Sequence, residues 1–178
     1  MFLKFKSNRA FSPIADSVLH TTRKLGCSGA ATFVNYNDSI VLEEYLGKQS
    51  NTADARKVQG DTQFHVASVR KSYIGFAVAY AIFYGKIKSI DDLILNYLPD
   101  LDKNVWKGTT IRHLLTHTHG LQEVEGTVIR ENPVGENWTY RQVGINALTK
   151  IIRRTTHKTI SEIVHEQVFE PLGFNESN

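Results

Sequence analysis

A serine and a lysine three residues apart are the pair in this sequence best suited to covalent chemistry. Ser68 and Lys71 form the pattern S-x-x-K, and residues with this spacing share one face of a helix, so the lysine amine can reach the serine hydroxyl. A serine hydroxyl is a weak nucleophile until a base takes its proton. A lysine becomes that base when burial or positive surroundings lower its pKa. The pair therefore predicts a serine nucleophile activated by a lysine.

The surroundings of Ser68 carry more information than the spacing. Eleven Ser and twelve Lys in 178 residues give roughly 0.7 chance occurrences of S-x-x-K, and a serine at a helix start is also a common N-cap. Here the serine follows a short extended segment, 64–67, and opens a helix expected over 68–84 that is apolar almost all round. A polar residue is costly there without a purpose, and the helix start offers backbone N–H groups that can stabilise an oxyanion. Nucleophile and N-cap are the two interpretations of Ser68.

The elements that must position this pair are mostly helical. Antiparallel strands are expected over 29–36 and 39–46, joined by a turn at Asn37 and Asp38. An isolated hairpin is marginally stable in water and leaves its edges open. Either helices cover this hairpin or strands that this sequence lacks complete the sheet, and we expect the second. Open edges also predict self-association, including strand exchange between copies. Helices are expected over 11–25, 90–97, 110–116 (capped by Gly120), 142–154 and 159–168, and loops over 47–62 and 121–139.

Composition limits the classes of protein to which the chain can belong. Apolar residues make up 41% and charged residues 22% of the chain, which sets aside disordered, collagen-like and coiled-coil proteins. A net charge of +3 without a basic cluster argues against nucleic acid as a partner. The longest apolar run, 73–84, is too short to cross a membrane, and the first nine residues lack the apolar core of a signal peptide. We therefore expect a cytoplasmic protein, or an exported one if a leader was removed, with no membrane partner.

The cysteine and the clustered histidines are better interpreted as structural residues than as reactive or metal-binding ones. Cys27 is the single cysteine, which excludes an internal disulfide and a cysteine-based zinc site; we expect it to be a buried small hydrophobe. His113, His117 and His119 lie within seven residues, and the first two share a helix face. No carboxylate or cysteine stands at ligand spacing near them, so packing or capping is favoured over a zinc site, which stays open as a weaker hypothesis. No metal or organic cofactor is expected.

The segment F-H-V-A-S-V-R-K-S-Y-I-G-F-A, residues 64–77, resembles the active-site segment of the serine β-lactamase and penicillin-binding protein family. The branch it resembles contains class C β-lactamases, D-alanyl-D-alanine carboxypeptidases and related esterases. The resemblance continues in 85–99, in T-I-R-H-L-L-T-H-T-H-G-L at 110–121 and in P-L-G-F at 171–174. It implies a mixed α+β fold of the β-lactamase/transpeptidase type, an antiparallel sheet flanked by helices with a helical lobe.

The resemblance also implies roles for individual residues. Ser68 would be the acylated nucleophile, and Lys71 its partner base. Tyr140 stands where the family has the tyrosine of a Tyr-x-Asn motif, and would shuttle protons with both; the alternative is a loop aromatic packed beside Trp138. Gln142 replaces the asparagine of that motif, so it would contact substrate through a longer arm.

The third motif of the family, a Lys/His-Thr/Ser-Gly on a later strand, does not follow Tyr140 in this sequence. In the family that strand forms one wall of the site and supplies the second oxyanion donor. We therefore expect a single β-lactamase-related domain over 1–178 that is truncated before its C-terminal strands. Within it, 1–63 would form the N-terminal helix and hairpin, and 64–178 the active-site helix and helical lobe.

Three functions follow for testing. The first is a serine hydrolase that forms an acyl-enzyme on Ser68 with a small-molecule or peptidoglycan-like substrate: a β-lactam, a D-Ala-D-Ala-like peptide or a small ester. The second is a truncated or degenerate non-catalytic homologue that binds or self-associates without turnover. The third is a histidine-based metal-binding domain.

Overall fold

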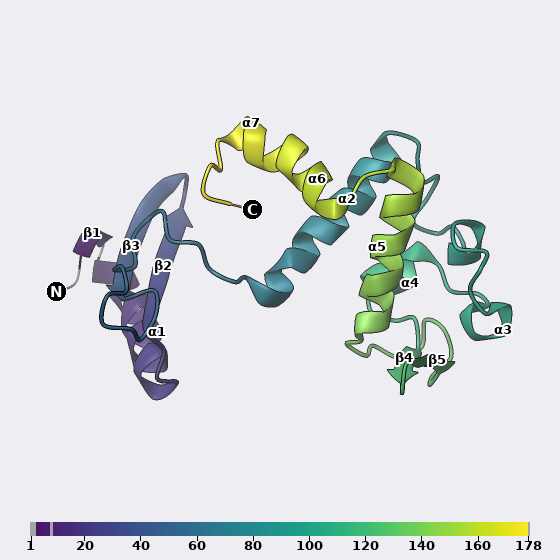
Figure 1. The fold of residues 1–178 in the computed structure, drawn as a ribbon, viewed down its shortest axis with the longest axis horizontal. Helices are drawn as coiled ribbons and strands as arrows, with labels where there is room; N and C mark the ends of the chain where they lie inside the picture. The colour runs from purple at the N-terminus through teal and green to yellow at the C-terminus, as the bar shows by residue number, and fades with distance from the viewer. Residues whose placement is uncertain (1–2, 8, 178) are drawn as a thin grey trace. The chain divides into compact units, whose positions relative to one another are not determined.

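The protein, described by a computed structural model over residues 3–7 and 9–177, forms two compact units (Figure 1). The first unit is Met1–Phe64 and the second is His65–Asn178. Sheet and hairpin residues dominate the first unit, whereas helices dominate the second. Among the described residues, no helix has both the length and the apolar character needed to span a membrane.

The N-terminal unit is a three-stranded antiparallel sheet with one helix. Its elements are β1 Leu3–Ser7, the 3₁₀ turn η1 Arg9–Phe11, α1 Ser12–Lys24, β2 Gly29–Tyr36 and β3 Ser39–Gly47. The strand order is β1-β3-β2, so β3 is central. Both turn residues of the β2–β3 hairpin are left-handed, with φ 49° at Asn37 and 55° at Asp38, as a two-residue hairpin turn requires. The predicted hairpin and the predicted first helix are confirmed.

The expectation that every further strand of the sheet lies outside this sequence was wrong, because a strand within the sequence pairs with the hairpin. The segment Leu3–Ser7 pairs with β3, with Leu3 opposite Tyr45 and Ser7 opposite Leu42. Its sequence, L-K-F-K-S, alternates apolar and basic residues, which is the period-two pattern typical of a strand. Each outer strand has one neighbour among the described strands, so self-association through these edges stays a prediction.

A small core fixes the N-terminal unit. Leu42 and Leu46 of β3 are buried together with Ala15 of α1 and Val58 of the following loop. Helix α1 packs on β2 and β3. Cys27, between α1 and β2, is exposed, so the expected burial of this thiol is wrong: it lies in the turn after the helix, beyond the face that covers the sheet.

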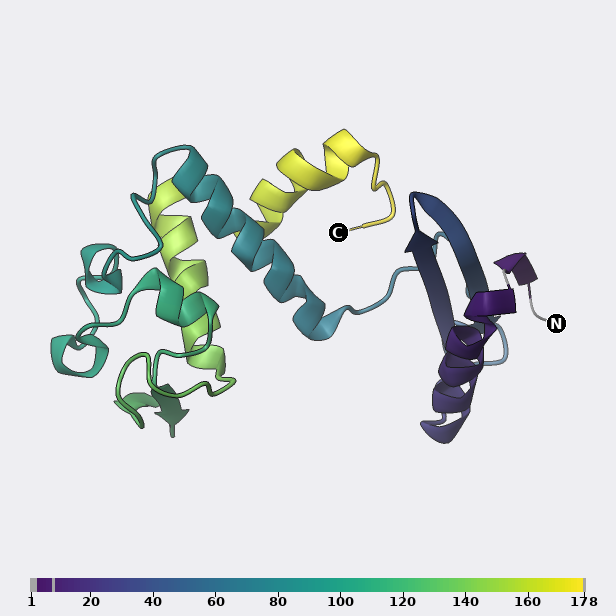
Figure 2. The same cartoon turned by 180° about the vertical axis from the view of Figure 1, so that it is seen from behind.

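The second unit is built around helix α2, Lys71–Phe83. Helices α5, Gln142–Thr156, and α6, Ile160–Val164, both pack against α2 (Figures 1 and 2). After α6 the chain continues through the π-helical turn η4, His165–Phe169, into α7, Glu170–Leu172. The core of this unit is a cluster of aliphatic side chains with one aromatic: Ile74, Ala77, Val78, Ala81, Ile87, Ile94, Leu98, Trp106, Ile111, Leu114, Leu121, Val143, Ile145, Ala147, Leu148, Ile151, Ile152 and Ile163.

The start of α2 differs from the expected helix. Residues Ala67–Arg70 form a 3₁₀ turn, η2, and the α-helix begins only at Lys71. Ser68 therefore lies on the 3₁₀ turn rather than on the first turn of an α-helix. In a 3₁₀ turn residues three apart eclipse each other, so the change keeps Ser68 and Lys71 on one side.

The segment between α2 and α5 holds two further corrections. Only the 3₁₀ turn η3, Ile94–Asn96, stands where a helix was expected over 90–97; the backbone N–H of Ile94 instead bonds to Thr109 O at 3.1 Å. The predicted loop over 121–139 contains a hairpin, β4 Leu121–Val124 and β5 Thr127–Arg130. The short helices here are α3 Lys103–Trp106, which was not predicted, and α4 Ile111–Leu115, which was.

The predicted cap of α4 is also wrong. The residue that leaves the helix in the left-handed conformation is His117, with φ 57°, rather than Gly120. Gly120 has φ 64° for a different reason: a β-carbon there would lie 2.2 Å from Asn132 O. Glycine is needed at that position because the chain after β5 passes against its backbone.

Candidate active site

The three residues expected to act together lie in hydrogen-bond contact. Lys71 Nζ donates to Ser68 Oγ at 2.9 Å, and Ser68 Oγ lies 2.7 Å from Tyr140 Oη. Lys71 Nζ is also 4.9 Å from the centre of the Tyr140 ring. The structure thus brings Tyr140 to a serine that is 72 residues away in the sequence. We call this trio the Ser68 corner.

Local backbone conformation presents Ser68 outward. Ala67 has φ +45°, a left-handed conformation that an L residue adopts only at an energetic cost. The turn that follows is closed by Val69 N–H bonding to Val66 O at 3.0 Å. Because the chain reverses at Ala67 and enters the 3₁₀ turn directly, the Ser68 side chain is exposed, while Lys71 is half-buried.

Packing of α5 on α2 places Tyr140, the third residue of the Ser68 corner. Tyr140 lies two residues before α5, and Val143 and Ala147 of that helix are buried in the core shared with α2. Arg141, between Tyr140 and the helix, forms a bidentate ion pair with Glu131, at 2.7 Å and 3.0 Å. Helix packing and this ion pair together fix the segment that carries the phenol.

The electrostatics favour loss of a proton from Tyr140. Hydrogen bonding by Lys71 is the largest cause that lowers the pKa of Tyr140 below its ordinary value, followed by hydrogen bonding to Ser68. The positive charges of Lys71 and Arg70 act in the same direction, and partial burial opposes them. A phenol whose pKa is lowered by cations is a suitable proton acceptor for the neighbouring serine hydroxyl.

Gln142, the fourth predicted site residue, is not part of this contact set. Its side chain is exposed on the first turn of α5, and Nε2 donates to Asn146 Oδ1 at 3.1 Å, one turn further along the helix. Among the described residues it forms no hydrogen bond to Ser68, Lys71 or Tyr140. A substrate contact through Gln142 stays a prediction.

Two aromatic neighbours of Tyr140 were not predicted as part of the site. The ring centre of His117 lies 4.7 Å from that of Tyr140, with 34° between the planes. Trp138 lies further away, at 6.4 Å, and is 67% exposed. Sequence reasoning placed Trp138 beside Tyr140 but treated His117 only as a packing, capping or metal-binding residue. The signal that pointed to His117 was its position directly after a predicted helix end.

The two other clustered histidines have structural roles. His113 completes the capping box of α4, with its Nδ1 accepting from Thr110 N–H at 3.1 Å. His119 is fully buried, and burial lowers its pKa to about 4; its Nδ1 accepts from Leu121 N–H at 3.1 Å. A β-carbon on Gly144 would lie 2.8 Å from the His119 ring, so glycine at this position lets α5 approach the histidine.

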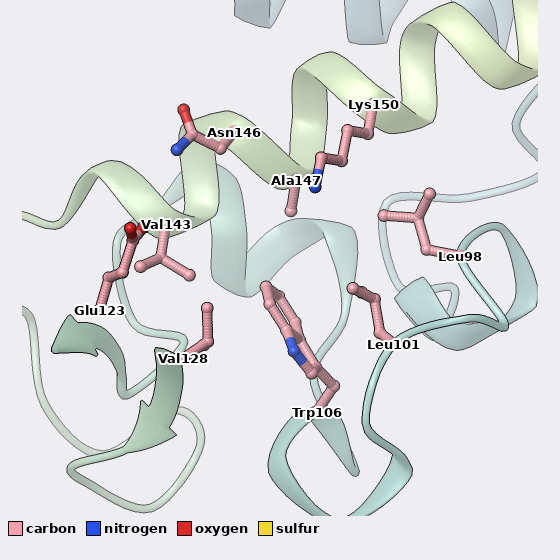
Figure 3. A pocket seen from close by; sticks show the side chains of 9 residues that line it. All are labelled: Leu98, Leu101, Trp106, Glu123, Val128, Val143, Asn146, Ala147 and Lys150. Carbon is pink, nitrogen blue, oxygen red and sulfur yellow. The ribbon is translucent and has the colours of Figure 1, made fainter. Parts of the chain in front are cut away.

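A cavity beside α5 is separate from the Ser68 corner. It has a volume of about 110 Å³ and lies between α5, the β4–β5 hairpin and the segment 98–106 (Figure 3). Figure 3 shows Trp106 pointing toward Ala147, and Glu123 and Lys150 also line the cavity. None of the three residues of the Ser68 corner lines it.

Comparison with known proteins places the chain in a family. The family model described as Beta-lactamase matches residues 14–178. The chain belongs to the Beta-lactamase family. The resemblance noted in the sequence is thereby confirmed, and with it a serine hydrolase type of function for the group to which the chain is related.

The relatives named in this family have different activities. The chain is 50% identical over 174 residues to an uncharacterized protein of Alkalihalophilus pseudofirmus, covering 98% of this chain and 51% of that protein. It is 26% identical over 183 residues to esterase EstB of Burkholderia gladioli, covering 83% and 46%. It is also 26% identical over 164 residues to a β-lactamase of Yersinia enterocolitica, covering 84% and 42%. The chain thus spans about half the length of these relatives.

Solved structures confirm the predicted fold class. A penicillin-binding protein homologue from Caulobacter crescentus superposes with a TM-score of 0.78 at 18% identity, covering 97% of this chain and 51% of that one. A class C β-lactamase superposes with a TM-score of 0.78 at 20% identity, covering 94% and 51%. The mixed α/β fold of the β-lactamase/transpeptidase type is therefore shown for this member of the Beta-lactamase family.

Proposed function

We propose that the protein is a β-lactamase-related serine hydrolase that acts through an acyl-enzyme on Ser68. The observation that carries the proposal is the placement of Ser68 Oγ between two proton-handling groups, Lys71 Nζ at 2.9 Å and Tyr140 Oη at 2.7 Å. A nucleophile within hydrogen-bond reach of its base is the geometric requirement for activating a serine. The lowered pKa of Tyr140 supports its part in moving that proton.

In the proposed reaction, Ser68 takes the acyl group from the substrate and water then removes it. Ser68 Oγ forms a bond to the acyl carbon, and its proton passes to Tyr140 as the phenolate or to Lys71 as the neutral amine. The carbonyl electron pair moves onto oxygen and is stabilised by backbone N–H groups. When the oxyanion collapses, the bond to the leaving nitrogen or oxygen breaks, and the leaving group takes the proton. Water then attacks the acyl carbon, releases the acid and returns a proton to Ser68.

The substrate class proposed is a compound with a transferable acyl group: a β-lactam, a D-Ala-D-Ala-like peptide or a small ester. Support comes from the relatives, which include proteins named β-lactamase and esterase. The fold alone does not choose among these acyl groups, because one fold carries many specificities. The reaction class therefore rests on the Ser68 corner, and the leaving group is left to experiment.

Intact-mass spectrometry with two reactive probes tests the proposal. The protein is incubated with a fluorescent penicillin and, separately, with a fluorophosphonate, beside the Ser68→Ala variant. We expect one adduct per chain that is absent from the variant. The probe that reacts faster separates lactam from ester chemistry. Absence of an adduct with either probe would contradict the proposal and favour the non-catalytic homologue.

A further inference from the structure

We infer that the ring of His117 is a positioning group for Tyr140, holding the phenol against Ser68 and Lys71. The inference rests on the proposed role of Tyr140 in moving the proton of Ser68. It concerns a residue outside the predicted trio, and it is carried by two contacts that link residue 117 to residues 139 and 140.

The backbone at His117 is one that glycine normally occupies. After α4, Thr118 N–H bonds to His113 O at 2.9 Å and His117 N–H bonds to Leu114 O at 3.4 Å. These two bonds close a Schellman motif, whose left-handed residue is most often glycine. His117 takes this position with φ 57°. Position 117 thus carries an aromatic ring where the backbone alone would favour glycine.

The same residue is tied by its backbone to the segment that carries the phenol. The carbonyl oxygen of His117 accepts a hydrogen bond from Thr139 N–H at 2.9 Å, and Thr139 immediately precedes Tyr140. This bond aligns the two segments of chain. The imidazole lies along the Tyr140 ring, with 4.7 Å between the ring centres and 34° between the planes. An offset arrangement of this kind is favourable for two flat rings.

Of the two aromatic neighbours of Tyr140, His117 confines the phenol ring more closely. Trp138 lies 6.4 Å from Tyr140 and is 67% exposed, so it limits the phenol little. By contrast, Nδ1 of His117 is buried and has no hydrogen-bond partner among the described residues. The imidazole therefore contributes a packed surface at this point rather than a hydrogen bond.

Charge supports the same conclusion. Lys71, Ser68 and Arg70 lower the pKa of Tyr140. The charged group that affects the pKa of His117 is Lys71, and the ring of His119 lies 6.4 Å from that of His117. Burial, and then the charge of Lys71, lowers the pKa of His117, so its imidazole is neutral at neutral pH. A neutral ring can pack on the phenol without replacing Lys71 as its cationic partner. If the ring is removed, Tyr140 is free to leave Lys71, and its pKa should return upward.

The test measures the pKa of Tyr140 directly. Protein labelled with ¹³C at the tyrosine Cζ is titrated by NMR, and the Tyr140 signal is assigned with Tyr140→Phe. The main variant is His117→Gly, which suits the left-handed backbone and removes only the ring. His117→Asn is a second variant without the ring, because asparagine also tolerates this conformation. His117→Phe restores a flat ring, and Trp138→Ala is the matched control.

We expect His117→Gly and His117→Asn to remain folded, with thermal midpoints within about 5 °C of the original protein. In both, the pKa of Tyr140 should rise toward its ordinary value, because Lys71 no longer holds it down. His117→Phe and Trp138→Ala should titrate as the original does. An unchanged Tyr140 pKa in folded His117→Gly would overturn the inference. So would a rise in His117→Phe equal to that in His117→Gly, or the unfolding of both ring-free variants, which would assign His117 a purely structural role.

This titration is independent of turnover. If Ser68 takes up no probe while His117→Gly still raises the pKa of Tyr140, the proposed hydrolase activity fails and the positioning role stands. If Ser68 is labelled in the original protein, the midpoint of its pH–rate profile should move upward in His117→Gly by the same shift as the Tyr140 signal.

Discussion

The Ser68 corner and the helical core behind it are built in opposite ways. In the corner, polar side chains bond to one another at the surface, with Tyr140 48% exposed, beside two non-glycine residues in the left-handed conformation, Ala67 and His117. In the core, aliphatic side chains of α2 and α5 such as Ala77 and Ile151 are fully buried. The comparison indicates that the core provides stability and that the corner stores strain at exposed reactive groups. Stability and reactivity should therefore respond to different substitutions.

The largest effect is expected from Lys71→Ala. Removal of the amine takes away one of the two proton-handling groups beside Ser68 and the main cause of the lowered pKa of Tyr140. The rate of fluorophosphonate labelling should therefore fall about 10²–10⁴-fold, while the thermal midpoint changes little. Lys86→Ala, at an exposed position three residues after the end of α2, is the control and should label at the original rate. Equal losses in the two variants would show that Lys71 acts only as one more surface charge.

The second effect belongs to the core. Ile151→Ala removes three carbon atoms from a side chain with no exposed surface, which should lower the free energy of unfolding by about 2–5 kcal/mol. Arg153→Ala, on the exposed side of the same helix, should change it by less than about 0.5 kcal/mol. Urea unfolding followed by circular dichroism makes this comparison. Similar midpoints in the two variants would mean that α5 does not anchor the unit.

Gly144→Ala tests the contact that lets α5 approach His119. The added β-carbon would lie 2.8 Å from the imidazole, and overpacking of this kind costs about 1–3 kcal/mol. Gly75→Ala is a matched control on α2, where a β-carbon meets nothing within 4 Å and helix propensity should stabilise by about 0.5–1 kcal/mol. Opposite signs of the two changes, measured by urea unfolding, are the expected result; a stabilising Gly144→Ala would contradict the packing.

The smallest effect is expected at Ala67. Glycine adopts φ +45° without the steric cost that alanine meets there, but it also loses more freedom on folding. Ala67→Gly should therefore raise the free energy of unfolding by at most about 1 kcal/mol. Ala79→Gly, on the exposed side of α2, should lower it by about 1 kcal/mol. A loss at Ala67 as large as that at Ala79 would argue that no strain is stored before Ser68.

Local pattern was sufficient to predict much of the helical framework. Helix α1 of the N-terminal unit, helix α5 that follows Tyr140, and the β2–β3 hairpin lie close to their predicted bounds, because each has strong periodicity and clear stop signals. Ser68 and Lys71 were found from their spacing together with the apolar helix that follows Ser68, since a single turn sets their distance. Tyr140 required the family resemblance, because nothing local in the sequence links it to a serine 72 residues away.

The elements and contacts that were not predicted from the sequence share a physical cause. Strand β1 is stabilised by pairing with β3, and the β4–β5 hairpin is too short to show a convincing alternation. The position of His117 depends on a helix end, a left-handed backbone and a contact with residues 139 and 140. Such features come from tertiary contacts that override local preference, so a single sequence does not display them.

The most direct test of the central claim compares two serines on the same helical segment. Ser72 directly follows Lys71 and is exposed, and its hydroxyl has no hydrogen-bond partner among the described side chains. Fluorophosphonate labelling followed by peptide mapping gives the rate at each serine. We predict that Ser68 reacts at least about 10²-fold faster than Ser72, and that Ser68→Ala leaves Ser72 unlabelled over the same period. Equal rates at the two serines would contradict the claim that Lys71 and Tyr140 activate Ser68.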